Sequence, residues 1–433
     1  MASKSNGSSP RRAAILGGNR IPFARSGGAY AQASNQDMLT ATIDGLVSRF
    51  SLQGEVLGEV IAGAVLKHSR DFNLTRESVL GSRLSLTTPT YDVQQACDTG
   101  IEASILVANK IKLGQIDSGI GGGVDTTSDA PIEINDDLRR VLMDANATKS
   151  PAERVKLLGR LRPGQIVPQL PRNQEPRTGL SMGEHTALMA SDWEVTREAQ
   201  DELAAESHQR LAAAYERGFF DDLLTPYLGL SRDENLRADS SVEKLAKLKP
   251  VFGNDNGAAA TMTAGNSTPL TDGAAVVLLG SDEWAAEHGL PVRAYLTHSE
   301  TAAVDYIHGD DHLLMAPAYA VPRMLKRAGL ELGDFDFYEI HEAFASQVLA
   351  TLAAWEDPEW CREHLGLDGA LGSINRAKLN VNGSSLAVGH PFAATGGRIV
   401  GTLAKMVDER GSGRGLISIC AAGGQGVVAI LEK

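Results

Sequence analysis

Two thiols and two imidazoles lie in short segments rich in glycine and alanine, where a reactive side chain can come close to a ligand. Cys97, in QQACDTG, falls between a predicted strand end and a nearly apolar helix. A helix N-terminus stabilises a thiolate through its free N–H groups and its dipole, and such sites can bring a thiol pKa down to about 3.5–7.5. His390, in AVGHPFAATGGR, follows a glycine and could take the thiol proton as a base. These residue types indicate nucleophilic catalysis.

The other two groups, Cys420 and His341, also come at predicted strand ends. In ISICAAGGQG, the glycines after Cys420 would let backbone N–H groups face a ligand, as an oxyanion hole requires, and this second thiol could act as acid and base. In YEIHEAFASQ, His341 could donate to a developing enolate oxygen, and Glu342 is expected in the first turn of a helix, where it would compensate the dipole. Taken singly, each residue is more often structural, so their joint placement carries the hypothesis.

Asp98 directly follows Cys97 and bears on the reactivity of the thiol. Its charge would raise the pKa of the thiol if the carboxylate pointed at the sulfur. Acidic residues are also favoured at the start of a helix. We therefore expect Asp98 to point away from the sulfur and to cap its helix.

The elements that must position these groups form a repeated strand–helix pattern. In the N-terminal part, strands are predicted over 12–17, 59–65, 90–94 and 118–125, with helices over 35–50, 73–84 and directly after Cys97. In the C-terminal part, strands are predicted over 291–297, 335–340, 378–383, 416–422 and 426–432, with helices over 317–328, 341–355 and 393–407. Strands alternating with helices indicate mainly parallel sheets covered by helices, the α/β class.

The two parts read as copies of one α/β unit, and this duplication explains the placement of the reactive groups. Cys97 and His390 each follow the third strand of their own half, and His341 follows the second strand of the C-terminal half. Ligands in such sheets bind outside the carboxyl ends of the strands. Two related halves could therefore aim these groups into one shared pocket.

Domain boundaries follow from where the pattern stops. We expect a disordered tail over residues 1–12, an N-terminal half over 13–130 that is completed by about 250–285, a loop domain over 131–250 and a C-terminal half over 286–433. The insertion contains its own helix, predicted over 197–217, and several basic residues that could bind phosphates. Long insertions of this kind are often lids or binding loops.

Composition excludes several classes of function. The net charge of −13 argues against general nucleic-acid binding. The three cysteines lie far apart without CxxC spacing, so a disulfide framework or structural zinc site is not expected and a cytoplasmic location fits. No apolar run is long enough to span a membrane, and the N-terminal residues lack the apolar region of a secretory signal.

Five segments, in order along the chain, closely resemble the thiolase family: QQACDTG, TMTAGNSTPLTDGAA, EIHEAFA, NVNGSSLAVGHPFAATGGR and CAAGGQG. The HEAF form, where many thiolases have NEAF, resembles the degradative subtype related to the β chain of the mitochondrial trifunctional protein. The resemblance implies a five-layered αβαβα sandwich built from two βαβαβαββ halves with an inserted loop domain. It also implies CoA-dependent cleavage of a 3-ketoacyl-CoA, or the reverse condensation of acetyl-CoA, through an acyl-enzyme.

By this resemblance, Cys97 would be the nucleophile, His390 its base and Cys420 a second acid and base. His341 and His390 would hold the thioester oxygen, and the backbone N–H groups of Cys97 and Ala422 would hold the oxyanion on the transferred acyl group. Alanine stands at 422 where many relatives have glycine, which a backbone N–H tolerates if φ is negative there.

The ligands and partners that the resemblance implies are acyl-CoA and CoA, which are substrates. No cofactor and no metal are implied. Met182, from LSMGEH, and Thr268, from NSTPL, are candidate contacts for CoA. A homodimer or homotetramer is expected, and the HEAF form raises a hydratase/dehydrogenase α chain as a partner.

Two other functions stay open at this point. A decarboxylating ketoacyl synthase would share the fold, but such relatives typically lack the late cysteine that Cys420 provides. A CoA-binding or scaffolding subunit would result if Asp98 had disabled Cys97.

Overall fold

The computed structural model describes residues 11–254, 260–309 and 311–433, and most of the tail predicted over 1–12 lies outside these ranges. Its N-terminal half contains β1 (Ala14–Arg20), β2 (Ala24–Arg25), α1 (Asn35–Phe50), β3 (Glu59–Ala62), η1 (Ser69–Asp71), α2 (Leu74–Leu80), β4 (Thr90–Asp92), α3 (Thr99–Lys112), β5 (Ser118–Asp125) and β6 (Thr271–Gly280). Between β5 and β6 lie α4 (Asp136–Ala147), α5 (Pro151–Leu158), η2 (Pro163–Gln165), α6 (Met182–Asp192), α7 (Arg197–Glu216) and α8 (Val242–Leu245).

The C-terminal half repeats the order of the first. It contains α9 (Asp282–Glu287), β7 (Ala294–Ala303), α10 (Ala316–Ala328), β8 (Phe337–Ile340), α11 (Ala345–Glu356), α12 (Pro358–Leu365), η4 (Arg376–Lys378), α13 (Ser385–Val388), α14 (Ala394–Arg410), β9 (Arg414–Ala421) and β10 (Gln425–Glu432). The predicted helix over 35–50 and the predicted strand over 118–125 have the bounds of α1 and β5. Helix α1 starts at its predicted place because Ser34 and Asp37 form a reciprocal capping box.

The strands form one mixed sheet in the order β4-β3-β5-β6-β1-β7-β10-β9-β8. Strands β3, β4 and β5 are parallel, and so are β8 and β9, whereas β6 and β10 run antiparallel to their neighbours. The two halves meet where β1 pairs with β7 through Ala14 opposite Tyr295 and Ile15 opposite Ala294. The strand order is the same on either side of this junction, so the predicted duplication is confirmed.

One predicted strand is wrong. The segment 378–383 forms only a single bridge, between Leu379 and Tyr338. Asn380 has a φ of 46°, which breaks the extended backbone. Its side chain instead bonds both polar groups of Ile340, accepting from N–H and donating to C=O at 2.9 Å each. In the C-terminal half, a side-chain amide therefore makes the hydrogen bonds to the edge of β8 that a neighbouring strand would make.

Helices cover the sheet in layers. Helix α14 contacts strands of both halves, including β1, β5, β6, β7 and β9, and α3 packs beside it. Helix α1 contacts β1, β5 and β6, and α2 contacts β3 and β4, all in the N-terminal half. Helix α10 contacts β7, β9 and β10 in the C-terminal half. The arrangement is the predicted αβαβα sandwich, with α3 and α14 as its central layer.

The central helices approach each other at glycines. A Cβ on Gly396 would lie 2.1 Å from the backbone nitrogen of Ile101, and a Cβ on Gly100 would lie 2.5 Å from the carbonyl oxygen of Ala393. Any larger residue would therefore force α3 and α14 apart. Because Cys97 precedes α3 and His390 precedes α14, this close packing sets the distance between the two reactive groups.

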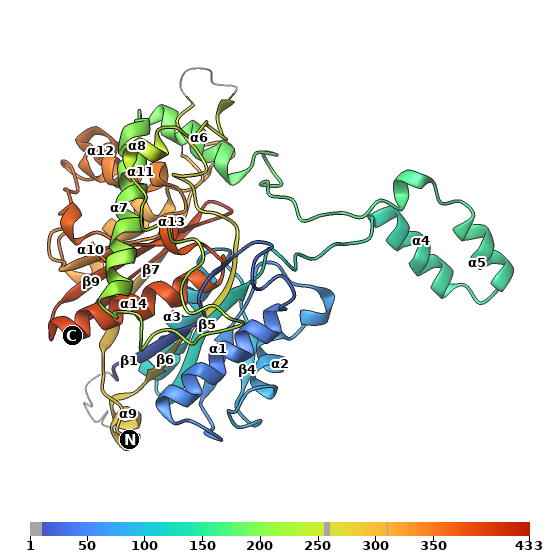
Figure 1. Cartoon of the computed structure of the whole chain (residues 1–433), viewed down its shortest axis with the longest axis horizontal. Coiled ribbons are helices and arrows are strands. Elements are labelled where there is room, and N and C mark those ends of the chain that lie inside the picture. The colour runs from blue at the N-terminus through green and yellow to red at the C-terminus, as the bar shows by residue number, and fades with distance from the viewer. Residues whose placement is uncertain (1–10, 255–259, 310) are drawn as a thin grey trace, which may run out of the picture.

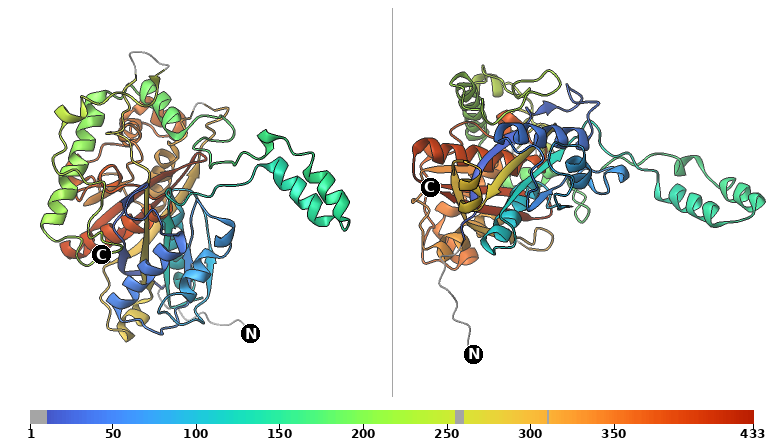
Figure 2. Two further views of the ribbon diagram at one scale, coloured as in Figure 1. Left: turned by 45° about the vertical axis from the view of Figure 1, so that its right-hand side comes forward. Right: turned by 90° about the horizontal axis from the view of Figure 1, so that it is seen from below.

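The insertion has two parts with different positions. Helices α6, α7 and α8 pack against the body, whereas α4, α5 and η2 form an arm that projects away from it (Figures 1 and 2). Helix α7 is joined to the core through Ser207, whose hydroxyl donates to Glu342 at 2.7 Å. None of the helices in the described ranges is long and apolar enough to cross a membrane.

Candidate functional site

Cys97 sits on a tight turn between β4 and α3. The preceding residue, Ala96, has a φ of 47°, in the left-handed region that alanine rarely adopts. The hydroxyl of Thr99 holds this turn by accepting from the N–H of Gln95 at 2.9 Å and donating to the carbonyl of Ala96 at 2.7 Å. Backbone strain of this kind persists only where the surroundings impose it, and it is common at functional sites.

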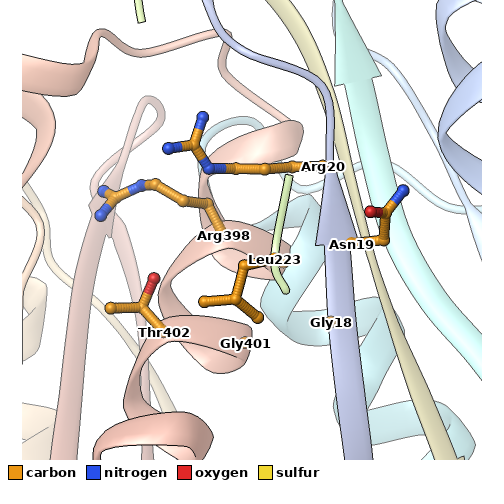
Figure 3. A pocket seen from close by; sticks show the side chains of 8 residues that line it. Gly18, Asn19, Arg20, Leu223, Arg398, Gly401 and Thr402 are labelled. Carbon is orange, nitrogen blue, oxygen red and sulfur yellow. The ribbon is translucent and has the colours of Figure 1, made fainter. Parts of the chain in front are cut away.

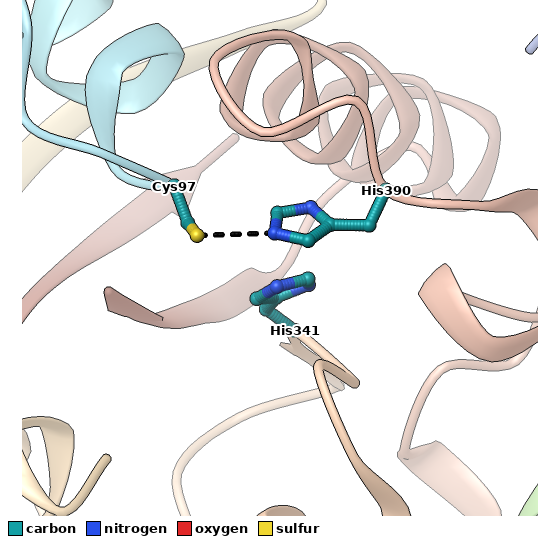
Figure 4. Close-up of side chains that lie close together, drawn as sticks. All are labelled: Cys97, His341 and His390. Carbon is teal, nitrogen blue, oxygen red and sulfur yellow. Dashed lines mark hydrogen bonds between the residues drawn. The ribbon is translucent and has the colours of Figure 1, made fainter. Parts of the chain in front are cut away.

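His390 is brought to Cys97 by a turn that threonines fix. Its Nε2 lies 3.0 Å from the Sγ of Cys97 (Figure 4). Its backbone N–H donates to the hydroxyl of Thr271 at 2.8 Å, and its Nδ1 lies 2.7 Å from the hydroxyl of Thr395. Gly389 has a φ of 105°, and a Cβ there would lie 2.7 Å from Thr271, so glycine is required before the histidine.

His341 lies beside His390 at the end of β8. The two ring centroids are 4.2 Å apart. The Sγ of Cys97 and one ring nitrogen each of His341 and His390 all lie within 4.8 Å of one another (Figure 4). The Nδ1 of His341 is 2.7 Å from the hydroxyl of Ser385. Its Nε2 is buried and has no hydrogen-bond partner among the described residues. This nitrogen is therefore available to a ligand.

Cys420 and Ala422 complete the cluster from the end of β9. Cys420 is buried and pairs with Gly426 across the β9–β10 ladder. The pKa of its thiol is raised well above the usual range by burial and by the neighbouring Cys97. The backbone N–H groups of Ala422 and of Cys97 itself both act to lower the pKa of the Cys97 thiol, so both face its sulfur. The φ of Ala422 is not in the left-handed region, so an alanine is tolerated at this position.

The glycine turn after Ala422 is held from the insertion. Glu175, which is buried, accepts from the N–H of Gly423 at 2.9 Å and from the hydroxyl of Tyr306 at 2.9 Å. Gly423 and Gly424 both have positive φ, so the turn depends on glycine and needs an external contact to fix it. Sequence reasoning missed Glu175 because its partner is about 250 residues away and no local pattern connects them.

Burial, rather than the helix terminus, decides the charge state of the thiol and the imidazole. Burial, and after it the neighbouring Asp98, raise the pKa of Cys97 to about 12, against the lowering expected from the start of α3. Burial and the nearby Arg398 guanidinium lower the pKa of His390 to about 3, and the pKa of His341 is lowered well below its usual range by the same kind of causes. The lowering of the thiol pKa that a helix start favours is therefore outweighed. At neutral pH the site holds a neutral thiol against neutral imidazoles.

The capping role predicted for Asp98 is wrong. It occupies the N-cap position of α3, but its side chain makes no capping hydrogen bond, and neither carboxyl oxygen has a partner among the described residues. The side chain is fully buried, and burial and the neighbouring Glu102 raise the pKa of Asp98 well above its usual range. Burial therefore favours the neutral, protonated form of Asp98.

This protonation state gives a first testable result. Asp98→Asn replaces a neutral acid by a neutral amide of the same shape, so we expect the rate of Cys97 alkylation by iodoacetamide at pH 7 to stay within about threefold of wild type. An ionised Asp98 would behave differently, because its removal would lower the thiol pKa and speed alkylation more than tenfold. Mass spectrometry of the Cys97 peptide measures the rate, with alkylation of Cys97 in unsubstituted protein as the reference.

Glu342 and the two candidate CoA contacts lie around the HEAF segment. Helix α11 begins at Ala345, so Glu342 is not in its first turn as predicted; it is buried and accepts from the side chain of Asn380 at 2.7 Å. Thr268 donates to the carbonyl of Ala343 at 2.9 Å, and Met182 packs against the apolar cluster that contains Cys420. Neither Met182 nor Thr268 belongs to the thiol–imidazole cluster.

The fold and this cluster together define a class of protein: a duplicated α/β sandwich with a buried thiol–imidazole site at the strand ends where its halves meet. The chain belongs to the thiolase family. The family model for the thiolase N-terminal domain matches residues 13–283, and that for the C-terminal domain matches residues 290–433.

Individual relatives and solved structures agree with this assignment. The chain is 40% identical to a 3-ketoacyl-CoA thiolase of Pectobacterium carotovorum and 39% identical to one of Yersinia pestis, in each case over 97% of its own length and 96% and 97% of the relatives. Among solved structures, the acetyl-CoA acetyltransferase of Bacillus anthracis matches with a TM-score of 0.80 and 30% identity over 98% of both chains. Human mitochondrial 3-ketoacyl-CoA thiolase in complex with CoA matches with a TM-score of 0.80 and 26% identity over 98% of both chains.

Proposed function

We propose that this chain is a degradative thiolase, an acetyl-CoA C-acyltransferase that cleaves a 3-ketoacyl-CoA with free CoA into acetyl-CoA and a shortened acyl-CoA. The observation that carries the proposal is the 3.0 Å contact between the Cys97 thiol and the His390 imidazole, with the second thiol of Cys420 beside it. The printed names of the relatives, 3-ketoacyl-CoA thiolases, support the same substrate class. The reverse condensation of acetyl-CoA uses the same groups.

In the first half of the proposed reaction, the Cys97 sulfur attacks the keto carbon while its proton passes to Nε2 of His390. The oxyanion that forms is held by the backbone N–H groups of Cys97 and Ala422, and one such donor is worth about 10²–10³ in rate. The bond between the α- and β-carbons then breaks, and its electron pair becomes the enolate of acetyl-CoA. His341 donates to the enolate oxygen, and Cys420 gives its proton to the α-carbon.

In the second half, Cys420 takes the thiol proton of incoming CoA. The CoA sulfur attacks the acyl-enzyme, and Cys97 leaves as a thiolate that recovers its proton from His390. After the second half, Cys97, His390 and Cys420 are back in their starting protonation states. Starting from neutral groups suits this sequence, because His390 gains its charge only as the sulfur becomes nucleophilic.

Two alternatives fit the observations less well. A decarboxylating ketoacyl synthase would leave the thiol of Cys420 without a role. A disabled CoA-binding scaffold would require Asp98 to suppress the thiol, but burial shifts the carboxyl of Asp98 toward its neutral form.

The experiment that tests the proposal compares CoA-dependent cleavage of acetoacetyl-CoA with that of a long-chain 3-ketoacyl-CoA. We expect cleavage of both, and the ratio of their kcat/KM values assigns the chain-length class. Decarboxylation of a malonyl thioester without thiolysis would instead identify a ketoacyl synthase. Binding of CoA with no reaction on any of these substrates would favour the scaffold.

The remaining expectations concern CoA binding, assembly and location, and they stay proposals. We propose that Met182 and Thr268 contact CoA, that acyl-CoA and CoA are substrates and no cofactor is needed, and that the protein acts in the cytoplasm. We also propose a homodimer or homotetramer, with a hydratase/dehydrogenase α chain as a possible further subunit. Light scattering of the purified chain, alone and with such a partner, measures the assembly.

A further inference from the structure

A chain of buried hydrogen bonds runs behind His341, away from Cys97. Arg398, in α14, places a terminal guanidinium nitrogen 2.8 Å from the hydroxyl oxygen of Ser385, the first residue of α13. The same hydroxyl lies 2.7 Å from Nδ1 of His341. Ser385 and His341 are fully buried and Arg398 is 3% exposed, so solvent does not compete for these bonds.

Arg398 stays charged in this position. Burial lowers the pKa of its guanidinium to about 10, which is still well above neutrality. Its side chain also lines a cavity of about 10 Å³ together with Arg20, on the side of α14 that faces β1 (Figure 3). That volume is about the size of one water molecule. The guanidinium is therefore fixed between β1 and α13, with few other orientations open to it.

The chemistry of the three groups sets the direction of each hydrogen bond. A guanidinium has only donors, so the oxygen of Ser385 must accept from Arg398. The hydroxyl hydrogen of Ser385 is then free to donate, and the other neighbour that the structure gives it is Nδ1 of His341. A neutral imidazole that accepts at Nδ1 carries its hydrogen on Nε2.

The opposite tautomer of His341 would leave more buried groups unpaired. With hydrogen on Nδ1, the oxygen of Ser385 would accept twice and its own hydrogen would have no partner among the described residues. Nε2 of His341 is buried without a partner among the described residues in either tautomer, so the hydroxyl hydrogen of Ser385 is what distinguishes the two. Unpaired buried polar groups are costly, so the Nε2–H tautomer is favoured.

His390 requires the other arrangement. To take a proton from Cys97, its Nε2 must present a lone pair to the sulfur 3.0 Å away, and its hydrogen must then lie on Nδ1. The hydroxyl of Thr395, 2.7 Å from that Nδ1, can accept it. Two imidazoles in contact thus carry their hydrogens on opposite nitrogens.

We propose that Ser385, held by Arg398, is a positioning residue that fixes His341 as the Nε2–H tautomer and so makes it a hydrogen-bond donor to the enolate oxygen. Neighbouring His390 is left as the base. The inference rests on the proposed thiolase function for the identity of that oxygen. It explains how two adjacent histidines with similar burial divide into a donor and an acceptor.

A kinetic experiment separates this role from a general structural one. In the proposed reaction, transfer of an acetyl group between acetyl-CoA and labelled CoA uses Cys97, His390, Cys420 and the backbone oxyanion hole, whereas carbon–carbon cleavage also uses His341. We expect Ser385→Ala to lower kcat for thiolysis of acetoacetyl-CoA by roughly ten- to a hundredfold. We expect acetyl exchange to fall at least tenfold less than thiolysis, with KM nearly unchanged.

Ser384→Ala is the matched control. Its hydroxyl lies 3.3 Å from the same guanidinium nitrogen of Arg398, but no hydrogen bond joins it to His341. We expect both reactions of this variant to stay within about threefold of wild type, whereas Ser385→Thr, which keeps the hydroxyl, should recover part of the lost thiolysis. Equal losses of exchange and thiolysis in Ser385→Ala, or the same loss in Ser384→Ala, would overturn the proposal.

The tautomer itself can be measured without turnover. In wild-type protein labelled with ¹⁵N-histidine, two-bond nitrogen–proton correlations distinguish the two tautomers, and His341→Asn identifies the His341 signal. We expect hydrogen on Nε2 of His341, and its finding on Nδ1 would refute the inference even if the variants were inactive. Wild-type protein with the expected tautomer but no thiolysis would instead contradict the proposed function.

Discussion

Cys97→Ala is expected to lower CoA-dependent thiolysis by on the order of 10⁴-fold or more, because the acyl group would have no sulfur on which to transfer. Binding of CoA should persist, since the neighbouring backbone keeps its Thr99 hydrogen bonds. Steady-state thiolysis of acetoacetyl-CoA measures the loss. Mass spectrometry of protein mixed with acetyl-CoA should show an acetylated Cys97 peptide in wild type and none in the variant.

The chain offers a control for this substitution within its own sequence. Cys361 is fully buried, whereas Cys97 is partly buried, and the thiol of Cys361 donates to the carbonyl of Ala354 at 3.3 Å in the C-terminal half. Cys361→Ala removes a buried thiol of the same size, so we expect some loss of thermal stability and a kcat within about twofold of wild type. Comparable inactivation of both variants would show that Cys97 serves the fold rather than the reaction.

Cys420→Ala is expected to have the second largest effect, a loss of about 10²–10⁴-fold in thiolysis, the range typical of removing a general acid–base group. The α-carbon would lose its proton donor and CoA would lose its base. Exchange of solvent deuterium into the methyl group of acetyl-CoA, followed by mass spectrometry, reports directly on proton transfer at that carbon. We expect this exchange to fall as far as thiolysis.

A different outcome would reassign Cys420. Retention of more than a tenth of the wild-type rate by Cys420→Ala, with loss of stability like that of Cys361→Ala, would mean that Cys420 only fills space between β9 and the centre of the fold. In that case, the proton for the enolate would have to come from His390, which already holds one from Cys97 in the proposed sequence.

The electrostatics of the site explain why neutral resting groups are compatible with catalysis. A permanent thiolate beside a buried, cationic histidine would have to be desolvated in every unliganded molecule. With the pKa of Cys97 raised to about 12 and that of His390 lowered to about 3, the ion pair forms only when the sulfur attacks. The backbone N–H groups of Cys97 and Ala422 face the sulfur, and in the proposed reaction they hold the oxyanion that forms on the substrate.

Hydrogen bonds to two buried carboxylates join the insertion to the site. Glu175 belongs to it and holds the glycine turn after Ala422, and Glu342 of the core receives the hydroxyl of Ser207 from α7. The insertion is therefore joined to the oxyanion turn and to the segment that carries His341.

From the sequence alone, the class of fold and the duplication could be predicted, and four candidate reactive side chains could be named. Strand and helix periodicity is local, so α1 and β5 could be predicted to the residue, and the alternation of elements implied parallel strands whose ends converge. The strand predicted over 378–383 failed because Asn380 replaces ladder hydrogen bonds with side-chain ones, and β-propensity does not register that exchange.

The charge and hydrogen-bond state of the site became apparent only from the packing of the folded chain. Whether Asp98 is an ionised cap or a buried neutral acid depends on how completely the surrounding elements exclude water, and no local pattern encodes that. The same holds for Arg398, Ser385 and His341, which come from three elements and meet only because α13 and α14 pack against the end of β8. The sequence gives the chemical type of each side chain, whereas its burial and its hydrogen-bond partners depend on how distant segments pack together.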